Sequence, residues 1–306
     1  MKEINIFEVG GFKIGHAQDK DAMTGCTIFL PDDCAPAGID IRGGGPASRE
    51  IHLLDPLMAA TGIHGILLSG GSAFGLDAAG GVMEYLEERN IGFDVGVTKV
   101  PLVCQSSLFD LMIGSSTSRP TKAMAYEACL NATNLKIESG SIGAGTGCTI
   151  GKILGPEYAM KSGIAYHAYQ VGNIKVGAIV ALNALGDVYD SQTGQQVAGL
   201  QNETKNGLRS SEDVLFEMME NPTNLFNGNT TLGIIVTNCY FSKAELCKLA
   251  GMTQNAYARA IKPVHTTADG DSIYAVSTGK QIGDINAVGS LAIKAMEAAI
   301  LKAAKG

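Results

Sequence analysis

The chain has 306 residues, of which 45% are hydrophobic and 17% charged, and its 23 basic and 30 acidic residues give a net charge of −7. This size suffices for one large hydrophobic core. A mildly acidic chain with scattered basic residues has no electrostatic reason to bind nucleic acid or an anionic membrane.

The cysteine and glycine content narrows the class of protein further. Seven cysteines occur without a CxxC pair, which favours buried, reduced thiols over a disulfide framework. The 39 glycines alternate with apolar runs and indicate tight turns and close backbone contacts. The chain start lacks the apolar stretch of a signal peptide, and no apolar run approaches the roughly 20 residues of a membrane helix. We expect a cytoplasmic protein without a membrane span, folded as a single domain over residues 1–306.

The first half of the chain predicts a tight strand-to-helix connection. Residues 65–69 form a short apolar run typical of a buried strand, and the apolar residues of 73–89 recur at helical spacing, with Ser72 as the N-cap. A second helix is expected over residues 121–132, directly after Pro120.

The second half alternates strands and helices. Strands are expected over residues 163–171 and 175–182, and the polar stretch 187–228 predicts only a short helix at 211–220 and a loop at 221–229. The remaining elements are a strand at 231–237, a helix at 243–261, a strand at 272–277 and a helix at 284–304. Runs that are apolar on both faces indicate sheets covered on both sides. A layered αββα arrangement of the α+β class fits, and the pattern alone leaves other α/β layouts open.

A polar loop leads directly into the strand that begins near Thr230. A threonine hydroxyl is a weak nucleophile that needs a base. The α-amine of an N-terminal threonine can be that base, since its pKa is about 8. Thr230 is internal, so this chemistry requires a cut after Asn229, which the Thr230 hydroxyl itself could make by attacking the Asn229 carbonyl. The other interpretation is a simple turn followed by a β-branched strand start.

A second motif places Asp269 and Asp271 around Gly270, again just before a strand. The two carboxylates can face one point if the glycine turns sharply, and could then orient a hydroxyl and raise the pKa of a nearby amine. The other interpretation, which the motif alone favours, is a common solvated turn or a partial cation site. His265, a few residues earlier, is interpreted as a structural hydrogen-bonding residue.

Three further positions could assist. Asn183 ends an apolar strand, where its amide could donate to an oxyanion or cap a turn. Lys152 follows a glycine-dense stretch and could supply a fixed positive charge. The loop 69–75 lacks the spacing of a phosphate-binding loop, although its backbone N–H groups could meet a substrate carboxylate.

Taken together, these motifs resemble the S58 peptidases, which include D-aminopeptidase/esterase-amidases, β-peptidyl aminopeptidases and the endo-type 6-aminohexanoate (nylon) oligomer hydrolase. The resemblance covers nearly the whole chain. Its segments are IRGGGP at 41–46 with Arg49-Glu50, LSGGSAFGLD at 68–77, FDL at 109–111, GAGTG at 143–147, Gly151-Lys152, NTTLG at 229–233, His265-Thr266 and DGD at 269–271.

The resemblance implies a precursor that cuts itself between Asn229 and Thr230 into residues 1–229 and 230–306. It also implies a four-layer αββα sandwich resembling Ntn hydrolases with a different connectivity, assembled as a homo-oligomer, often a tetramer. The substrate would be a small peptide or amide, and neither a metal nor another cofactor is required.

The resemblance also suggests a role for each site residue. Thr230 would be the nucleophile, with Asp269 and Asp271 as in the nylon-oligomer branch, Lys152 as the catalytic lysine and Asn183 as the oxyanion donor. Phe109 falls where several members have a tyrosine that assists the oxyanion, so that hydroxyl would be absent.

Two other functions stay open at this point. An acyltransferase of the ornithine-acetyltransferase type shares the fold and the threonine self-cleavage, but passes the acyl group to an amine. A non-cleaving relative would only bind a small ligand in the same pocket.

Overall fold

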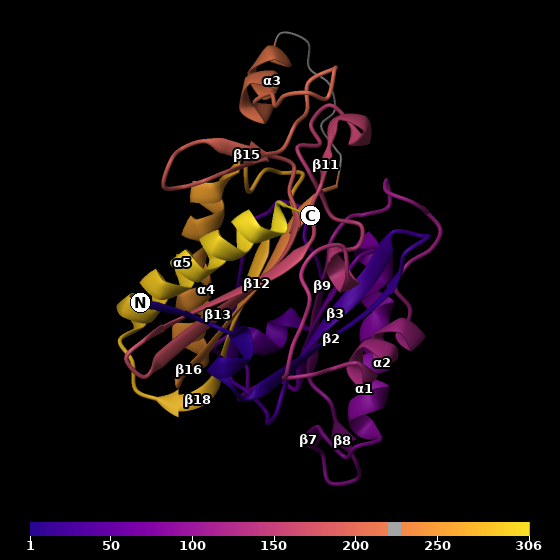
Figure 1. Ribbon diagram of the computed structural model, residues 1–306. Coiled ribbons are helices and arrows are strands. Elements are labelled where there is room, and N and C mark those ends of the chain that lie inside the picture. The colour runs from indigo at the N-terminus through magenta and orange to yellow at the C-terminus, as the bar shows by residue number, and fades with distance from the viewer. Residues whose placement is uncertain (220–227, 306) are drawn as a thin grey trace.

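The structure is a computed structural model that describes residues 1–219 and 228–305. Its larger sheet mixes antiparallel and parallel pairs (Figure 1). Over the described residues its strand order is β1 (Lys2–Ile4), β12 (Ile164–Val171), β13 (Ile174–Asn183), β16 (Thr230–Cys239), β18 (Ser272–Gln281) and β4 (Ala37–Ile41).

A second sheet lies against the inner face of the first. Its strand order is β2 (Phe12–Asp19), β3 (Thr24–Pro31), β6 (Gly65–Ser69), β9 (Val103–Ser107) and β5 (Ala47–Arg49). The space between the two sheets is filled by a buried apolar cluster with side chains from both, such as Phe29 and Ile66 from the second sheet and Ile179 and Ile234 from the first.

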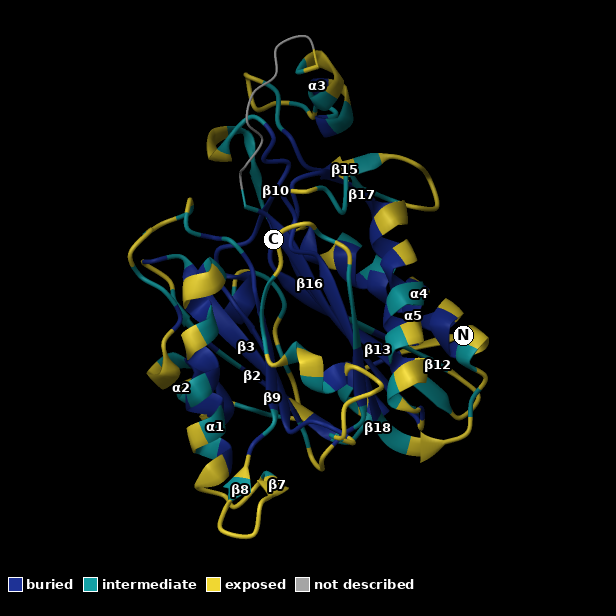
Figure 2. Cartoon of the chain, turned by 180° about the vertical axis from the view of Figure 1, so that it is seen from behind, coloured by how far each residue is buried: buried dark blue, intermediate teal, exposed yellow. Residues whose placement is uncertain are grey.

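Helices cover the outer face of each sheet (Figure 2). On the first sheet lie α4 (Lys243–Ala260) and α5 (Ile285–Ala303), and on the second lie α1 (Ala79–Glu87) and α2 (Lys122–Leu130). Each helix pair shares a separate apolar cluster with its sheet. The described residues therefore form helix, sheet, sheet and helix layers, which confirms the predicted αββα sandwich.

Local sequence explains where the helices over the first sheet begin. Ser242 caps α4 in a reciprocal arrangement with Glu245, and Asp284 caps α5 by accepting two backbone N–H groups. These helices end within one residue of the predicted boundaries.

Each sheet contains one parallel strand pair joined by a helical crossover. In the second sheet, α1 connects β6 to β9, and in the first sheet α4 connects β16 to β18. The β16–β18 pairing matches Leu232 with Ser272, and an isolated parallel bridge between Asn229 and Asp269 extends it beyond the strands. This register brings the two motifs of the sequence side by side.

The helix predicted at 73–89 is only partly correct. Residues Ser72–Ala78 form a 3₁₀ helix, η3, and the α-helix starts at Ala79. Ser72 is not the N-cap, because it adopts a left-handed φ of 53° and its side chain makes no capping bond. A Cβ on Gly75 would lie 2.0 Å from the Gly70 carbonyl oxygen, so the tight turn depends on tertiary packing that periodicity does not report.

The stretch 187–219 has more structure than the sequence predicts. A small sheet joins β15 (Gln196–Ala198), β14 (Asp187–Tyr189) and β17 (Ile261–Lys262), and α3 covers Ser211–Glu217. The buried carboxylate of Asp187 accepts the N–H groups of Leu200 and Ser211 and the Ser211 hydroxyl. One side chain thus holds a polar segment together. Of the predicted loop at 221–229, residues 221–227 lie outside the described residues.

The remaining elements are short. They are β7 (Phe93–Asp94) with β8 (Lys99–Val100), β10 (Thr149–Ile150) with β11 (Met160–Lys161), and the 3₁₀ helices η1 (Ile6–Val9), η2 (Ile51–Leu54), η4 (Gly143–Gly145) and η5 (Pro156–Tyr158). Among the described residues, no helix is long and apolar enough to span a membrane. Five of the cysteines are buried, but Cys34 is exposed and Cys247 partly so, which corrects the expectation that all are buried.

Candidate active site

Thr230 begins β16 in the middle of the larger sheet, with neighbours on both sides. Antiparallel pairing places it opposite Asn183 at the end of β13, and the parallel bridge of Asn229 with Asp269 places the aspartate motif on the other side. Thr230 is only 3% exposed and Asn229 only 1%. The predicted nucleophile is therefore buried at a junction of strand ends.

The peptide carbonyl of Asn229 receives two donors. The Thr230 hydroxyl donates to this oxygen, and the backbone N–H of Gly270 donates to it at 2.9 Å. The Asn229 N–H is itself held by the Ala268 carbonyl at 3.1 Å. The peptide bond before Thr230 thus lies next to the Thr230 hydroxyl, and its carbonyl is polarised by the Gly270 N–H.

The N–H of Gly270 on the Asn229 carbonyl is a contact that the sequence prediction missed. The φ of Gly270 is not in the left-handed region, so backbone conformation does not require glycine here. The position needs glycine for space, because a Cβ would lie 2.6 Å from the Thr230 Oγ1 and 3.0 Å from the Gly45 carbonyl oxygen.

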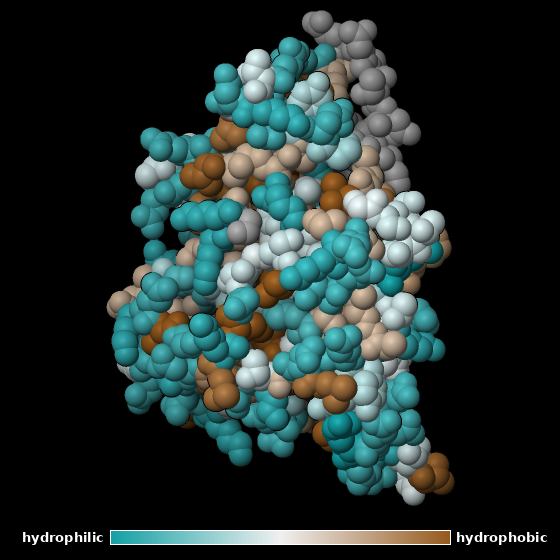
Figure 3. Space-filling view, turned by 45° about the vertical axis from the view of Figure 1, so that its right-hand side comes forward, coloured by the Kyte–Doolittle hydropathy of each residue, from teal (hydrophilic) through white to brown (hydrophobic). Residues whose placement is uncertain are grey.

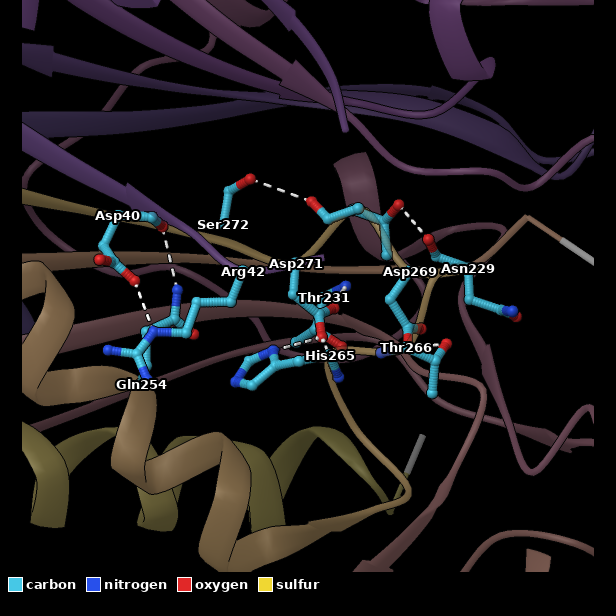
Figure 4. A network of polar contacts seen from close by, with 12 residues as sticks. Asp40, Arg42, Asn229, Thr231, Gln254, His265, Thr266, Asp269, Asp271 and Ser272 are labelled. Atoms are coloured by element: carbon cyan, nitrogen blue, oxygen red, sulfur yellow. Dashed lines mark hydrogen bonds and ion pairs between the residues drawn. The ribbon is translucent and has the colours of Figure 1, made fainter. Parts of the chain in front are cut away.

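Asp269 and Asp271 are both buried, and each carboxylate has its own partners (Figure 4). Asp269 Oδ2 accepts the N–H and the hydroxyl of Thr266, at 2.8 and 2.6 Å. Asp271 accepts the Thr231 N–H on Oδ1 at 2.8 Å, and the N–H and Nδ1 of His265 on Oδ2 at 3.2 and 2.9 Å. His265 is a hydrogen-bonding residue, as predicted.

The two carboxylates lie close enough to affect each other's charge. Burial, and then the negative charge of Asp271, raise the pKa of Asp269 to about 6, although the bonds from Thr266 act in the opposite direction. A carboxylate that titrates near pH 6 can exchange a proton under physiological conditions.

Lys152 lies on the opposite side of the strand end, bonded to Asn183. Its Nζ donates to the Asn183 Oδ1 at 2.8 Å and to the Asn183 carbonyl at 3.1 Å. Burial lowers the pKa of Lys152 to about 7, and nearby Asp269 and Asp271 only partly oppose this shift. The predicted fixed positive charge is therefore replaced by one that depends on pH.

Asn183 uses both ends of its side chain. Its Oδ1 also accepts the Thr149 N–H at 3.1 Å, and its Nδ2 donates to the Phe109 carbonyl at 2.8 Å. The amide that would donate to an oxyanion is therefore bonded to Phe109 in this structure.

Phe109 also forms the wall of a small pocket beside Asn229. Its ring lies so close to Gly228 that a Cβ there would be 2.6 Å from it. That Phe109 stands in the place of an oxyanion tyrosine stays a prediction. The pocket is lined by Phe109, Met112, Ile113, Thr149, Lys152, Pro156, Gly228 and Asn229, and most of its surface is apolar.

The glycine loop at 69–75 uses three of its N–H groups, those of Gly70, Gly71 and Ser72, within the fold. The N–H of Gly71 donates to Asp110 Oδ1 at 2.7 Å, and those of Gly70 and Ser72 donate to the carbonyls of Gly25 and Leu108. The expected contact with a substrate carboxylate is therefore wrong for these groups, because the fold already uses them.

The glycines after Arg42 instead support the aspartate motif from behind. The N–H groups of Gly44 and Gly45 donate to the carbonyls of Thr266 and Asp269. Close backbone contacts thus explain Gly43 and Gly44, whose Cβ would lie 2.3 Å from the Asp269 carbonyl oxygen and 2.7 Å from the Thr267 Cα, whereas Gly45 has room for a Cβ.

The fold defines the class of protein. An L-aminopeptidase D-Ala-esterase/amidase of Ochrobactrum anthropi, a prototype for the serine aminopeptidases and a variant of the Ntn hydrolase fold, superposes with a TM-score of 0.75 at 16% identity, over 97% of this chain and 85% of that one. A β-aminopeptidase of Burkholderia sp. superposes with a TM-score of 0.67 at 18% identity, over the same shares. The chain has the Ntn hydrolase fold.

The sequence comparisons identify the family. The model of Peptidase family S58 matches residues 5–305. An uncharacterized aminopeptidase of Mycobacterium tuberculosis is 36% identical over 291 residues, 90% of this chain and 81% of the relative. A 6-aminohexanoate-oligomer endohydrolase of Paenarthrobacter ureafaciens is 28% identical over 323 residues, 99% and 87% of the two chains. The chain belongs to Peptidase family S58, and it is a hydrolase of peptide or amide bonds.

Proposed function

We propose that the chain cuts itself between Asn229 and Thr230, and that Thr230 then acts as the N-terminal nucleophile of an aminopeptidase. The two products would be residues 1–229 and 230–306. The observation that carries this proposal is the Asn229 carbonyl, which accepts both the hydroxyl of Thr230 and the N–H of Gly270.

The self-cleavage follows from this geometry. Thr230 Oγ attacks the Asn229 carbonyl carbon and loses its proton to a base of the site, for which Asp269 and Lys152 are candidates because their pKa values lie near neutrality. The Gly270 N–H stabilises the resulting oxyanion. The C–N bond breaks, the nitrogen takes up a proton, and an ester links Asn229 to Thr230 Oγ. Water then hydrolyses this ester, which leaves a carboxylate on Asn229 and a free α-amine on Thr230.

The freed amine supplies the base for turnover. With a pKa of about 8, it can take the proton of its own hydroxyl as Oγ attacks the substrate amide. Asn183 would hold the new oxyanion once its amide is released from the Phe109 carbonyl. Lys152, Asp269 and Asp271 set the local charge, and water releases the acyl group.

The substrate class we propose is a small peptide or amino-acyl amide. Relatives named as aminopeptidases and as 6-aminohexanoate-oligomer endohydrolases support this range. The mostly apolar pocket beside Asn229 favours an acyl group with an apolar side chain or methylene chain.

Intact-protein mass spectrometry of the purified protein tests the self-cleavage. We expect fragments of roughly 24 and 8 kDa, in proportion to their lengths within the 31.8 kDa chain, with Thr230 as the new N-terminus. A single species that persists through purification and prolonged incubation would contradict the proposal. A panel of aminoacyl p-nitroanilides, including β-alanyl, D-alanyl and 6-aminohexanoyl derivatives, then identifies the substrate.

We also propose that the protein is a homo-oligomer. The hairpin β7–β8 projects from one end of the molecule (Figures 1 and 2) and carries exposed apolar side chains, with Val97 93% and Phe93 56% exposed. Apolar residues mark the lower tip of the space-filling view (Figure 3). An isolated two-stranded hairpin is marginally stable in water, and a second copy could cover it.

Light scattering after size-exclusion chromatography tests this assembly. We expect a tetramer, and Val97→Asp should lower the mass. Ile282→Asp is the matched control, because Ile282 is 96% exposed outside the hairpin. A monomeric wild-type protein would overturn this part of the proposal.

A further inference from the structure

His265 makes an unusually complete contact with one carboxylate oxygen. Both its backbone N–H and its ring Nδ1 contact Asp271 Oδ2, at 3.2 and 2.9 Å (Figure 4). His265 adopts a left-handed φ of 58°, a conformation that few residues other than glycine take, although histidine, asparagine and aspartate take it more often than most. The backbone conformation and the ring therefore act on the same oxygen.

The groups around the His265 ring determine which ring nitrogen carries the hydrogen. Since an ionised carboxylate only accepts hydrogen bonds, Nδ1 must carry a hydrogen. The other ring nitrogen, Nε2, is buried and has no hydrogen-bond partner among the described residues. An imidazolium would bury a second N–H without an acceptor, at a free-energy cost. His265 is therefore assigned as the neutral Nδ1–H tautomer.

The other oxygen of Asp271 connects this histidine to the nucleophile strand. Asp271 Oδ1 accepts the N–H of Thr231, the peptide group that directly follows Thr230. His265 and Thr231 thus hold the carboxylate from opposite sides. The position of Thr230 in the strand depends on this chain of three residues.

We propose that His265 is a positioning residue, which clamps Asp271 against the Thr231 amide so that Asp269 is the member of the pair that exchanges a proton. This inference rests on the proposed self-cleavage. The charged or titratable groups around the pair are Lys152 and Tyr257, on other elements, besides His265 and the two aspartates themselves.

The role of His265 can be read from the acid limb of the rate–pH profile, which is the range of low pH in which the self-cleavage rate rises with pH. In the wild-type chain, the rate should rise with pH through about 6, where Asp269 loses its proton. Without the His265 ring, the negative charge of Asp271 is offset less, and Asp269 holds its proton more tightly. We expect the limb to move up by about one pH unit, so that the rate falls about twofold at pH 7 and about tenfold at pH 5.

The experiment compares His265→Gly with His265→Asn. Glycine and asparagine both accept the left-handed backbone, but only asparagine keeps a side-chain donor for Asp271. Refolded precursor is followed by mass spectrometry across pH 5–9. The proposal predicts a shifted limb for His265→Gly and near-complete recovery for His265→Asn. Asn90→Gly, at a remote left-handed position, should behave as wild type.

Three outcomes would overturn the inference while leaving the proposed function intact. These are a His265→Gly limb and rate equal to wild type, an equal slowing of both variants with no shift of the limb, or a limb that moves down. A wild-type chain that never cleaves overturns the proposed function as well.

A second measurement needs no destabilising variant. In ¹⁵N-histidine-labelled Thr230→Ala protein, the ring nitrogen shifts of His265, assigned by their loss in His265→Asn, should show the neutral Nδ1–H tautomer at pH 7. A neutral Nε2–H tautomer would overturn the inference.

Discussion

The two helical crossovers of the molecule place polar clusters in similar surroundings but use them differently. At the end of β6 and β9, the hydroxyls of Ser69 and Ser107 bond each other at 2.7 Å, and Asp110 accepts the Gly71 N–H and the Thr24 hydroxyl. At the start of β16 the hydroxyl of Thr230 instead meets a peptide carbonyl.

The difference sets apart a cluster that holds the fold together from one that we propose to be reactive. Burial raises the pKa of Asp110 as it does that of Asp269, so a perturbed carboxylate does not identify the site by itself. Around Asp269 there is also a second carboxylate, a hydroxyl next to a peptide bond and an N–H on that carbonyl. The predictions below test this distinction.

Removing the hydroxyl should have the largest effect. Thr230→Ala is expected to leave the chain uncut and to lower any hydrolytic rate by about 10³-fold or more, because no other group replaces the nucleophile. Mass spectrometry and a p-nitroanilide assay measure both effects. Ser107→Ala removes a buried hydroxyl of the other crossover and should still be cut. Cleavage of Thr230→Ala at the same bond would refute the assignment.

Displacing the Gly270 N–H should have the next largest effect. Gly270→Ala forces a Cβ toward the Thr230 Oγ1, and the loss of an aligned oxyanion donor slows such reactions about 10²–10³-fold. The rate of precursor cleavage after refolding is the measurement. Gly45→Ala is the control, since its Cβ would meet atoms only at 3.7 Å. Equal rates for the two variants would contradict the role of Gly270.

Replacing a single aspartate in each cluster by asparagine should distinguish the two clusters directly. Asp269→Asn should slow self-cleavage about 10²-fold and remove the acid limb near pH 6, because it removes a proton acceptor. Asp110→Asn should cost about 1–3 kcal/mol of stability through its lost hydrogen bonds, yet keep the limb. Rate–pH profiles measure the effect on cleavage, and urea unfolding measures the effect on stability. Identical rate–pH profiles for Asp269→Asn and Asp110→Asn would contradict the distinction between the two clusters.

The last prediction concerns the pH dependence of stability. Folding lowers the pKa of Lys152 from 10.5 to about 7, so the unfolded chain binds more protons between these values. The free energy of unfolding therefore rises with pH from about 7 to about 10. In the uncut Thr230→Ala background, Lys152→Met should flatten this rise in urea unfolding experiments. Replacing the exposed Lys13 by Met should leave it unchanged.

Much of the fold could be predicted because its central strands and outer helices have strong apolar patterns. The strand at 65–69 and the helices over the larger sheet are correct to within a residue or two. The 3₁₀ segment at Ser72–Ala78 was missed, since it depends on the contact of Gly75 with the Gly70 carbonyl. The small sheet around β14 was missed because the buried Asp187 organises it through contacts distant in sequence.

The site could be predicted only as a set of side chains. The structure places Thr230, Asn183, Lys152 and both aspartates together, although their roles remain predictions. The N–H of Gly270 could not be found from residue types, because every residue except proline has one and only strand register selects it. The bond between Asn183 and Phe109 likewise depends on how two loops meet.

The position of Thr230 at the start of a central strand has a consequence for the order of folding and cleavage. A cut before it would leave β16 and β18 in one fragment, while their neighbours β13 and β4 stay in the other. The two fragments would share one sheet and could not separate without unfolding. Because the carbonyl clamp exists only after β16 and β18 have aligned, only a folded chain would be cut, and a chain unfolded after the cut would have no intact bond with which to begin again.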